Sequence, residues 1–262
     1  MKNLLKIENW KLKIAFFALI LFLLVAKNAD AATISRPTQS LGLVGYWSFD
    51  VGKGGAKAVD MSGRGNNGTL TNMNTTAAWV GGKIGNALNF DGVDDYVKAG
   101  AGEAITGDMT ASAWVKTPSA ISTDYPQIIS RAGDGDTTNG WNLYWYRLGG
   151  ANKFSFIVKV GAGAWGDDYA QTADGFASPS TWYFVTGVRR GTTMEIWVNG
   201  KLEATDAGTS GTITYSASPT YQIGTKASGD VTTMWKGTID EVRVYNRALS
   251  AAEIYRLYNM AR

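Results

Sequence analysis

Histidine and cysteine are both absent from the 262 residues of the chain. Without histidine, the chain cannot contain a Ser-His-Asp triad, a Cys-His pair, a histidine-bearing zinc site or a facial-triad iron site. A metal site would have to be built from oxygen ligands, which favours a hard cation and calcium first of all. Without cysteine, the chain has no disulfides and depends on its core for stability.

An excess of positive charge is also lacking once the N-terminal region is set aside. The whole chain has 25 basic and 22 acidic residues, and residues 1–31 hold five of the lysines and two of the acids. The remaining chain has 20 of each sign, so its net charge is near zero. Nucleic-acid binding needs clustered Lys and Arg that displace counterions, so we expect no nucleic-acid partner.

The N-terminal region has the three parts of a secretory signal peptide. A lysine-rich start is followed by an apolar run at 14–26 and by Ala29-Asp30-Ala31, which fits the small-residue rule for cleavage. The run is 13 residues long, whereas a membrane-spanning helix needs roughly 20. We therefore expect residues 1–31 to be a signal peptide cleaved after Ala31, with an uncleaved anchor as the alternative. The mature protein would be secreted or held at the cell surface, with no membrane segment after cleavage.

Residues 32–41 are small and polar, which indicates a short linker, and 42–262 have the pattern of one large β domain. In the run "MTASAWVK", Ala111, Ala113 and Val115 share one face and Trp114 lies on the other. Runs of this kind predict strands at 43–49, 85–90, 94–98, 109–116, 126–131, 141–148, 153–160, 182–189, 192–198, 201–205, 220–224 and 235–246. So many short strands predict an all-β, two-sheet antiparallel sandwich of jelly-roll type.

A single helix is predicted, at the C-terminus. Ser250 and Glu253 have the spacing of a capping box, and Leu249 precedes the cap as in a hydrophobic staple. Ile254 and Leu257 continue one apolar stripe.

Four segments together resemble one family. They are "GLVGYWSFD" with "DMSGRGNNGTL", "GKIGNALNFDGVDDYV", "WYFVTGVRRGTTMEIWVNGK" and "GTIDEVRVYNRALSAAEIYRLYN". In this order they are similar to the LamG-like jelly-roll domains of the concanavalin A-like lectin and glucanase superfamily, from about Gly42 to the C-terminus. The resemblance implies a non-catalytic module that binds extracellular carbohydrate or protein, often with calcium, in adhesion or targeting.

The superfamily also includes glucanases, whose retaining members carry a strand with an E-x-D-x-E or E-x-D-x-x-E run. No such run occurs in this sequence. The candidates Glu195, Asp240 and Glu241 are isolated or adjacent, and adjacent strand residues point to opposite faces. We therefore expect no enzyme activity and no catalytic residue, and keep a glycoside hydrolase as the less favoured alternative.

The resemblance also implies a structural calcium ion. Matched by motif, its ligands would be Asp50, or the backbone of Phe49, with the Gly92 carbonyl and Asp240. Oxygens of this kind suit calcium. The alternative is that these acids only form Asx-type turn bonds. Asp94 and Asp95, which follow Gly92 in "NFDGVDDYVK", are interpreted as the polar lip of a hairpin.

Two Gly-rich loops and one aromatic strand are candidates for ligand binding. The candidate residues are Asp134, Asp136, Trp165, Asp167 and Asp168 in the loops and Tyr146 in "GWNLYWYR". Loops at a sandwich edge often bind ligands, and exposed rings can stack on sugars. The alternatives are plain hairpin loops and aromatic residues that fill the core.

The sequence as a whole thus favours an exported, non-catalytic module that binds extracellular carbohydrate or a surface protein. A purely structural surface domain without a soluble ligand is the alternative.

Overall fold

The computed structural model of the protein describes residues 39–118, 125–131, 139–161, 168–215, 219–226 and 230–261. The chain divides into two units, Met1–Thr38 and Gln39–Arg262, and the described residues belong to the second. The predicted signal peptide and most of the linker therefore lie outside them. Within the described ranges, no helix is both long and apolar enough to cross a membrane.

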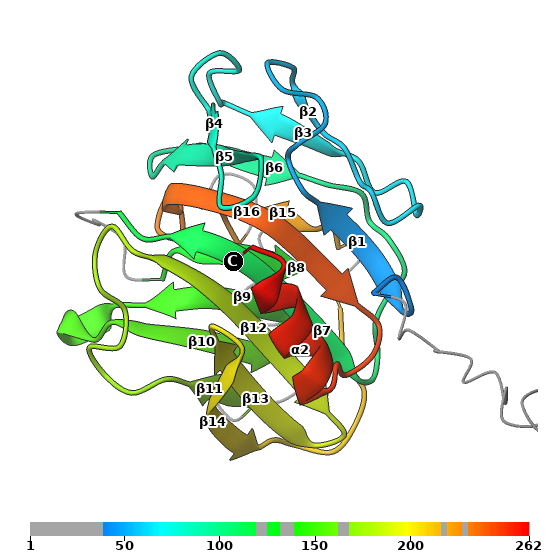
Figure 1. Ribbon diagram of the computed structural model, residues 1–262. Coiled ribbons are helices and arrows are strands. Elements are labelled where there is room, and N and C mark those ends of the chain that lie inside the picture. Colours follow the sequence, from blue (N-terminus) through cyan, green and yellow to red (C-terminus); the bar gives the residue numbers. More distant parts are fainter. Residues whose placement is uncertain are drawn as a thin grey trace, which may run out of the picture. The chain divides into compact units, whose positions relative to one another are not determined.

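The second unit is a sandwich of two eight-stranded sheets (Figure 1). Sheet A consists of β14 (Lys201–Ala207), β13 (Thr193–Val198), β12 (Trp182–Arg190), β7 (Met109–Lys116), β16 (Lys236–Tyr245), β5 (Asn86–Asp91) and β4 (Trp79–Gly81) in that order, with β1 (Leu43–Trp47) also paired to β16. Sheet B consists of β11 (Tyr169–Gln171), β10 (Lys153–Val158), β9 (Trp141–Tyr146), β8 (Gln127–Arg131), β15 (Gln222–Ile223), β6 (Tyr96–Lys98), β3 (Gly68–Thr71) and β2 (Lys57–Ala58). The pairs within both sheets are antiparallel. The predicted all-β sandwich is confirmed.

The core lies between the two sheets and follows the period-two alternation of the strands. On β7, Ala111, Ala113 and Val115 are buried in it, as the sequence predicts. On β9, Leu143 and Trp145 enter the same core. Full burial of a large apolar side chain stabilises the folded state by about 1.5–3 kcal/mol. A core of this kind can therefore stabilise the domain without disulfides.

The helix α2 (Ala251–Asn259) lies on the outer face of sheet A (Figure 1). Its Ile254 and Leu257 are buried in a second cluster with Trp114 and Phe184, which project from the outer face of that sheet. Tyr258 stacks on Trp114 with ring centroids 5.6 Å apart. Trp114 and Phe184 are therefore covered by the helix, so they are not free for a ligand.

Four strands were not predicted from the sequence: β2, β3, β4 and β11. Each has only two to four residues, and runs such as "KA" and "YAQ" have too few apolar residues to show an alternating pattern. They form because a neighbouring strand pairs with them. A short 3-10 helix, η1 (Leu148–Gly150), follows β9.

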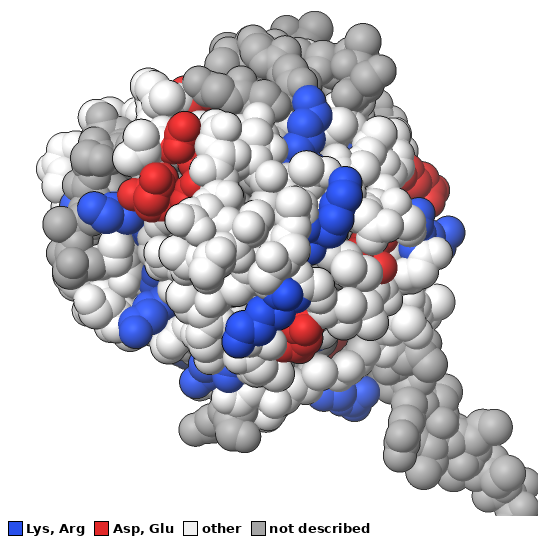
Figure 2. Space-filling view, turned by 90° about the horizontal axis from the view of Figure 1, so that it is seen from above, with Lys and Arg blue, Asp and Glu red and all other residues white. Residues whose placement is uncertain are grey.

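Charged side chains are interspersed over the surface seen in Figure 2. Lys and Arg side chains lie singly among Asp and Glu side chains, with uncharged surface between them. This distribution agrees with the balanced charge of the chain after residue 31.

Candidate functional site

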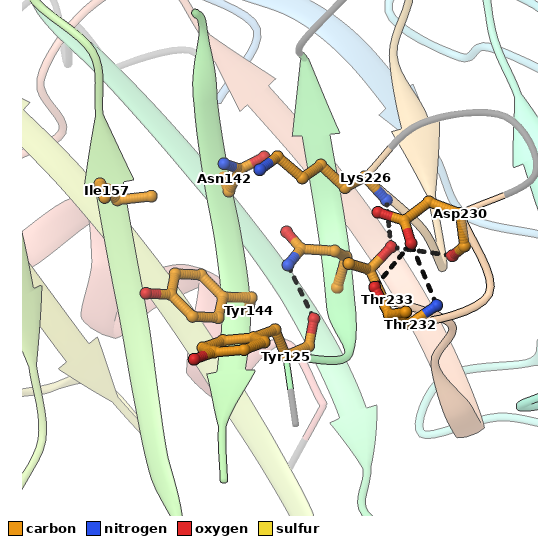
Figure 3. A pocket seen from close by; sticks show the side chains of 9 residues that line it. Tyr125, Asn142, Tyr144, Ile157, Lys226, Asp230, Thr232 and Thr233 are labelled. Atoms are coloured by element: carbon orange, nitrogen blue, oxygen red, sulfur yellow. Dashed lines mark hydrogen bonds between the residues drawn. The ribbon is translucent and has the colours of Figure 1, made fainter. Parts of the chain in front are cut away.

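The outer face of sheet B carries a pocket of about 310 Å³ (Figure 3). Its floor comes from β8, β9 and β10, and one side comes from the connection between β15 and β16. The lining residues are Tyr125, Gln127, Asn142, Tyr144, Ile157, Lys226, Asp230, Thr232 and Thr233. We call Thr225, Lys226 and Asp230–Thr233 the wall of the pocket.

Strand alternation determines which side chains form the floor. On β9, Leu143 faces the core, so Asn142 and Tyr144 face outward. The register then places Ile157 of β10 beside Asn142 and Gln127 of β8 beside Tyr144. Four strand positions on three neighbouring strands therefore meet on one surface.

Two side-chain amides on this floor have an oxygen without a hydrogen-bond partner. Asn142 and Gln127 are each only 3% exposed, and neither the Asn142 Oδ1 nor the Gln127 Oε1 atom has a partner. Buried polar atoms are normally paired, because an unpaired one loses its hydration without compensation. Neither oxygen is open to solvent, so a hydroxyl group in the pocket would bond to either one only after a shift of the side chains around it.

Tyrosine side chains lie at the edge of the pocket. Burial raises the pKa of Tyr144 above its usual value, so its hydroxyl stays protonated. Tyr125 meets Tyr146 edge to face, with ring centroids 5.5 Å apart. The predicted ligand residue Tyr146 does not line the pocket itself, but it supports Tyr125, which does.

The wall is fastened to the sheet by hydrogen bonds. The Ser130 hydroxyl of β8 donates to the carbonyls of Thr225 and Lys226, both at 3.0 Å. The backbone N–H of Gln127 donates to the Thr233 carbonyl at 2.9 Å. The two ends of the wall are thus fixed to the same strand, and the shape of the pocket on this side is set by the fold.

Asp230 is the one carboxylate among the residues that line the pocket. Its Oδ1 atom accepts from the backbone N–H and the hydroxyl of Thr232, at 3.0 and 2.6 Å. Glycoside hydrolysis needs two carboxyl groups about 5–10 Å apart across the substrate. The pocket lining does not supply the second.

The other acids that were weighed for catalysis have structural partners. Glu195 accepts from the Trp197 indole at 2.8 Å and from Arg190 at 3.0 Å. Glu241 forms a buried ion pair with Arg243 and accepts from the hydroxyl of Tyr46. These contacts lie on sheet A, away from the pocket.

Asp240 is a buried carboxylate with one unpaired oxygen. It is fully buried on β16, and its Oδ2 atom accepts from the backbone N–H groups of Lys83 and Ile84, at 2.8 and 3.0 Å. Its Oδ1 atom has no partner. Burial, with a smaller contribution from the charge of Glu241, raises the pKa of Asp240 to about 7. A cation beside Oδ1 would compensate the negative charge of the ionised Asp240 carboxylate.

Asp50 contacts the same turn, residues 82–86. Its Oδ1 atom accepts from the backbone N–H of Asn86 at 2.8 Å. Glycines allow this close approach, since a Cβ atom on Gly85 would lie 1.9 Å from the Asp50 Oδ1 atom and one on Gly82 would lie 2.5 Å from the Asp240 Oδ2 atom. The structure therefore brings Asp50 and Asp240 to one turn, and carboxylate oxygens are the ligand type that a hard cation prefers.

Gly92 does not join this pair. It lies in the turn after β5, and a Cβ atom there would meet the Lys236 side chain at 2.7 Å. Lys236 is four residues from Asp240 along β16, which corresponds to about 13 Å. Gly92 therefore lies beside Lys236 at the start of β16, whereas Asp240 lies farther along the same strand. The structure does not bring Gly92 together with Asp50 and Asp240.

The turn that contains Gly92 has a carboxylate cluster of its own. Oxygens of Asp91, Asp94 and Asp95 lie within 4.8 Å of one another, so this group could hold a metal ion. Asp91 accepts from the backbone N–H of Val93 at 2.8 Å, which is an Asx-type turn bond. The expected hairpin is wrong in one respect: β5 belongs to sheet A and β6 to sheet B, so this turn connects the two sheets.

Among the loop candidates, only Asp168 can be placed. It is buried and accepts a hydrogen bond from the backbone N–H of Thr209, so it connects two loops. The remaining candidates lie outside the described residues: Asp134, Asp136, Trp165 and Asp167. The flanking strands β8 and β9, and likewise β10 and β11, pair with each other, and the role of the two loops stays a prediction.

Most of the pocket cannot be predicted from the sequence. The alternation of "GWNLYWYR" indicates that Asn142 and Tyr144 face opposite to Leu143, which is the one local signal available. No local pattern connects them with Lys226 or Asp230, more than 80 residues later.

Comparisons with known proteins agree with this fold. Residues 90–255 match the model of the family Laminin_G_3, described as the concanavalin A-like lectin/glucanases superfamily. A comparison with curated protein sequences gives no match.

Solved structures of similar fold include domain 4 of the extracellular arabinanase AbnA from Geobacillus stearothermophilus, determined in complex with arabinotriose. It has 20% identity and a TM-score of 0.61, with 82% of this chain and 98% of that chain covered. The binding domain of Paraclostridial Mosquitocidal Protein 1 has 15% identity and a TM-score of 0.61, with 85% and 53% covered. The Trypanosoma rangeli sialidase has 20% identity and a TM-score of 0.56, with 83% and 33% covered. At these identities the likeness establishes the fold alone.

Proposed function

The chain belongs to the concanavalin A-like lectin/glucanase superfamily, and from this premise we propose that it is an exported, non-catalytic module that binds a glycan in the pocket on sheet B. The observation that carries the proposal is the pair of buried amide oxygens, on Asn142 and Gln127, that lack partners on the pocket floor. Sugars are rich in hydroxyl donors, which would complete both hydrogen bonds once a side-chain shift opens the two covered oxygens to the pocket. Tyr144 and Tyr125 add the apolar ring surface on which sugar rings commonly pack.

A binding role is favoured over hydrolysis by the chemistry of the lining. Asp230 is the single carboxylate in the pocket lining and is already held by Thr232. A general acid without a nucleophile or base opposite it does not cleave a glycosidic bond. The arabinanase domain of similar fold, solved with arabinotriose, makes oligosaccharides of this type a reasonable first ligand class.

A calcium ion between Asp50 and Asp240 is the second part of the proposal. Asp240 would supply the Oδ1 atom that has no protein partner, and Asp50 would supply the oxygens that its bond to Asn86 leaves available. When bound, the ion would neutralise a buried carboxylate and hold the turn at 82–86 against β16. Its role would be structural, because the turn belongs to sheet A and the pocket lies on the outer face of sheet B.

Export of the protein is proposed from the N-terminal signal alone. The pattern at residues 1–31 is that of a cleaved secretory signal peptide, which would place the module outside the cell or at its surface. A glycan ligand is consistent with that location. Mass determination of the N-terminus of the secreted protein would test the cleavage after Ala31.

Binding is tested with residues 32–262 on a glycan array, followed by calorimetric titration with arabinotriose and with the strongest array ligands. The variant Asn142→Leu should lose at least about tenfold in affinity, since it removes the acceptor. It should keep or raise the melting temperature, because it also removes an unpaired buried oxygen.

A matched control is Tyr255→Ala, which changes an exposed aromatic residue on α2, on the opposite sheet. Its affinity should equal that of the wild type. No binding on the array would contradict the proposal and favour a structural surface domain. Equal losses in both variants would contradict the placement of the ligand in the pocket on sheet B.

A further inference from the structure

The pocket on sheet B is closed at one end by its wall. Ser130 of β8 and Asn142 of β9 are directly paired, so their side chains point to the same outer face of sheet B. We call the line of paired outward side chains that runs across the strands through Asn142 the row. Ser130 is completely buried, and its hydroxyl donates to the carbonyls of Thr225 and Lys226, which lie above it. A ligand on the pocket floor therefore cannot continue along this row past β8.

The opposite end of the same row leads to the edge of the sheet. Asn142 pairs with Ile157 of β10, and Ile157 pairs with Tyr169 of β11. Neighbouring strands are about 4.8 Å apart, so the row extends about 10 Å beyond Asn142. Tyr169 is 36% exposed and β11 is the last strand of sheet B on this side, so this end is open to solvent.

The two ends differ in chemistry as well as in shape. In Figure 3, Lys226, Asp230 and Thr232 stand on one side of the pocket and Ile157 on the other. The Lys226 side chain extends from the wall toward Asn142 (Figure 3). The closed end thus presents an ammonium, a carboxylate and a hydroxyl group, whereas the open end presents an aliphatic side chain and a tyrosine ring.

A glycan chain has a matching difference along its length. Its terminal unit carries a free hydroxyl at the position where an internal unit carries the next glycosidic bond. That extra hydroxyl needs hydrogen-bond partners, and the next unit needs room. The wall offers partners and no room, which excludes an internal unit at this position.

From this arrangement we infer that the pocket recognises the end of a glycan chain, with the terminal unit against Lys226, Asp230 and Thr232 and the following units over Ile157 and Tyr169. The inference rests on the proposed function and adds the part of the polysaccharide that is bound. The length of the row limits the footprint to about two or three sugar units. Internal stretches of a long chain should not bind.

Chain-length dependence tests the inference. Residues 32–262 are titrated by calorimetry with linear oligosaccharides of two to six units from arabinan, xylan, β-glucan, mannan and galactan. In the series that binds, affinity should rise up to the trimer and then stay constant within about twofold. The corresponding polymer, partially hydrolysed, should bind more protein per unit mass than the intact polymer, in proportion to its chain ends.

Two variants locate the ends of the ligand. Tyr169→Ala should weaken binding of the trimer roughly fivefold and leave the dimer unchanged, since only the longer ligand reaches β11. Lys226→Met should weaken every length by the same factor, because each ligand has one end at the wall. Tyr255→Ala on α2 is the matched control, and melting curves of all three variants confirm folding.

The outcomes separate the two claims. Affinity that keeps rising to the hexamer, with intact polymer binding as well as hydrolysed polymer, would overturn chain-end recognition while leaving glycan binding intact. An absence of binding in all five series would overturn the proposed function and this inference with it.

Discussion

Asp240 is held in the folded domain by a backbone that is itself strained. Glu241, which follows it, has φ of 55°, and Phe49, which precedes Asp50, has φ of 60°. Residues other than glycine and asparagine rarely adopt this conformation, which costs about 1–3 kcal/mol. The strained residues stand directly beside the two acids proposed to hold calcium. Such strain is common at functional sites, where the surrounding fold maintains it.

Replacing Asp240 with asparagine should stabilise the metal-free protein at neutral and higher pH. The folded-state pKa of Asp240 is raised from 3.8 to about 7, mainly by burial. Its contribution to stability is therefore complete below about pH 4 and is lost as the pH rises through about 7. Asparagine stays neutral throughout, so in EDTA the variant should gain on the order of 2–4 kcal/mol over the wild type at pH 8 and nothing at pH 4. Urea unfolding at both values checks this.

Calcium should narrow or close the stability difference between the two proteins. A ligand that binds only the folded state stabilises it by about 2.7 kcal/mol at a concentration of 100 Kd. The wild type should gain this stability at pH 8, and Asp240→Asn should gain much less. Equal responses to calcium would show that the ion, if bound, does not use Asp240.

At the scale of the element, α2 depends on one acid at its start. Glu253 accepts from the backbone N–H of Ser250 at 2.9 Å and from both terminal nitrogens of Arg247, at 3.0 and 2.7 Å. The Arg247 guanidinium, with the Ser250 bonds, lowers the pKa of Glu253 to about 2. The capping box predicted from the sequence is confirmed, with Arg247 as an added partner.

Glu253→Gln should therefore destabilise the domain by about 1–2 kcal/mol at pH 7. Because the folded pKa is depressed, this contribution is complete above about pH 4.5 and is lost as the pH falls through about 2. The difference between the variant and the wild type should shrink over the same range in urea titrations. Glu203→Gln, which removes only the exposed pair with Lys201, is the matched control and should cost less than about 0.5 kcal/mol. A constant difference from pH 7 to pH 3 would contradict the assignment to charge.

At the scale of the whole molecule, the balanced charge predicts weak interaction with polyanions. Residues 32–262 have equal numbers of basic and acidic residues, and Figure 2 shows the two signs interspersed. Proteins that bind DNA without specificity do so with Kd of about 10⁻⁴ to 10⁻⁶ M, through clustered positive charge. Fluorescence anisotropy with a labelled duplex at low salt should show no binding in that range. A signal that disappears on adding salt would contradict the expectation.

Features that depend on neighbours along the chain can be predicted from the amino-acid sequence alone. The alternation of "MTASAWVK" places Trp114 opposite Ala113 because side chains of a strand point alternately to its two faces. The capping box at Ser250 is equally local. Such signals suffice for the sandwich and its helix, and the absence of histidine suffices to exclude whole classes of catalytic site.

The candidate binding sites, in contrast, depend on contacts between distant parts of the chain. Asn142 and Lys226 meet in one pocket because β8 pairs with β9 on one side and with β15 on the other. Asp50 and Asp240 lie at one turn because both carboxylates accept hydrogen bonds from backbone N–H groups of residues 82–86. Gly92 lies at the other end of β5, beside Lys236. The physical reason is that sheet register and loop anchoring are long-range interactions. They are set by the packing of the whole chain, and no short stretch of sequence contains them.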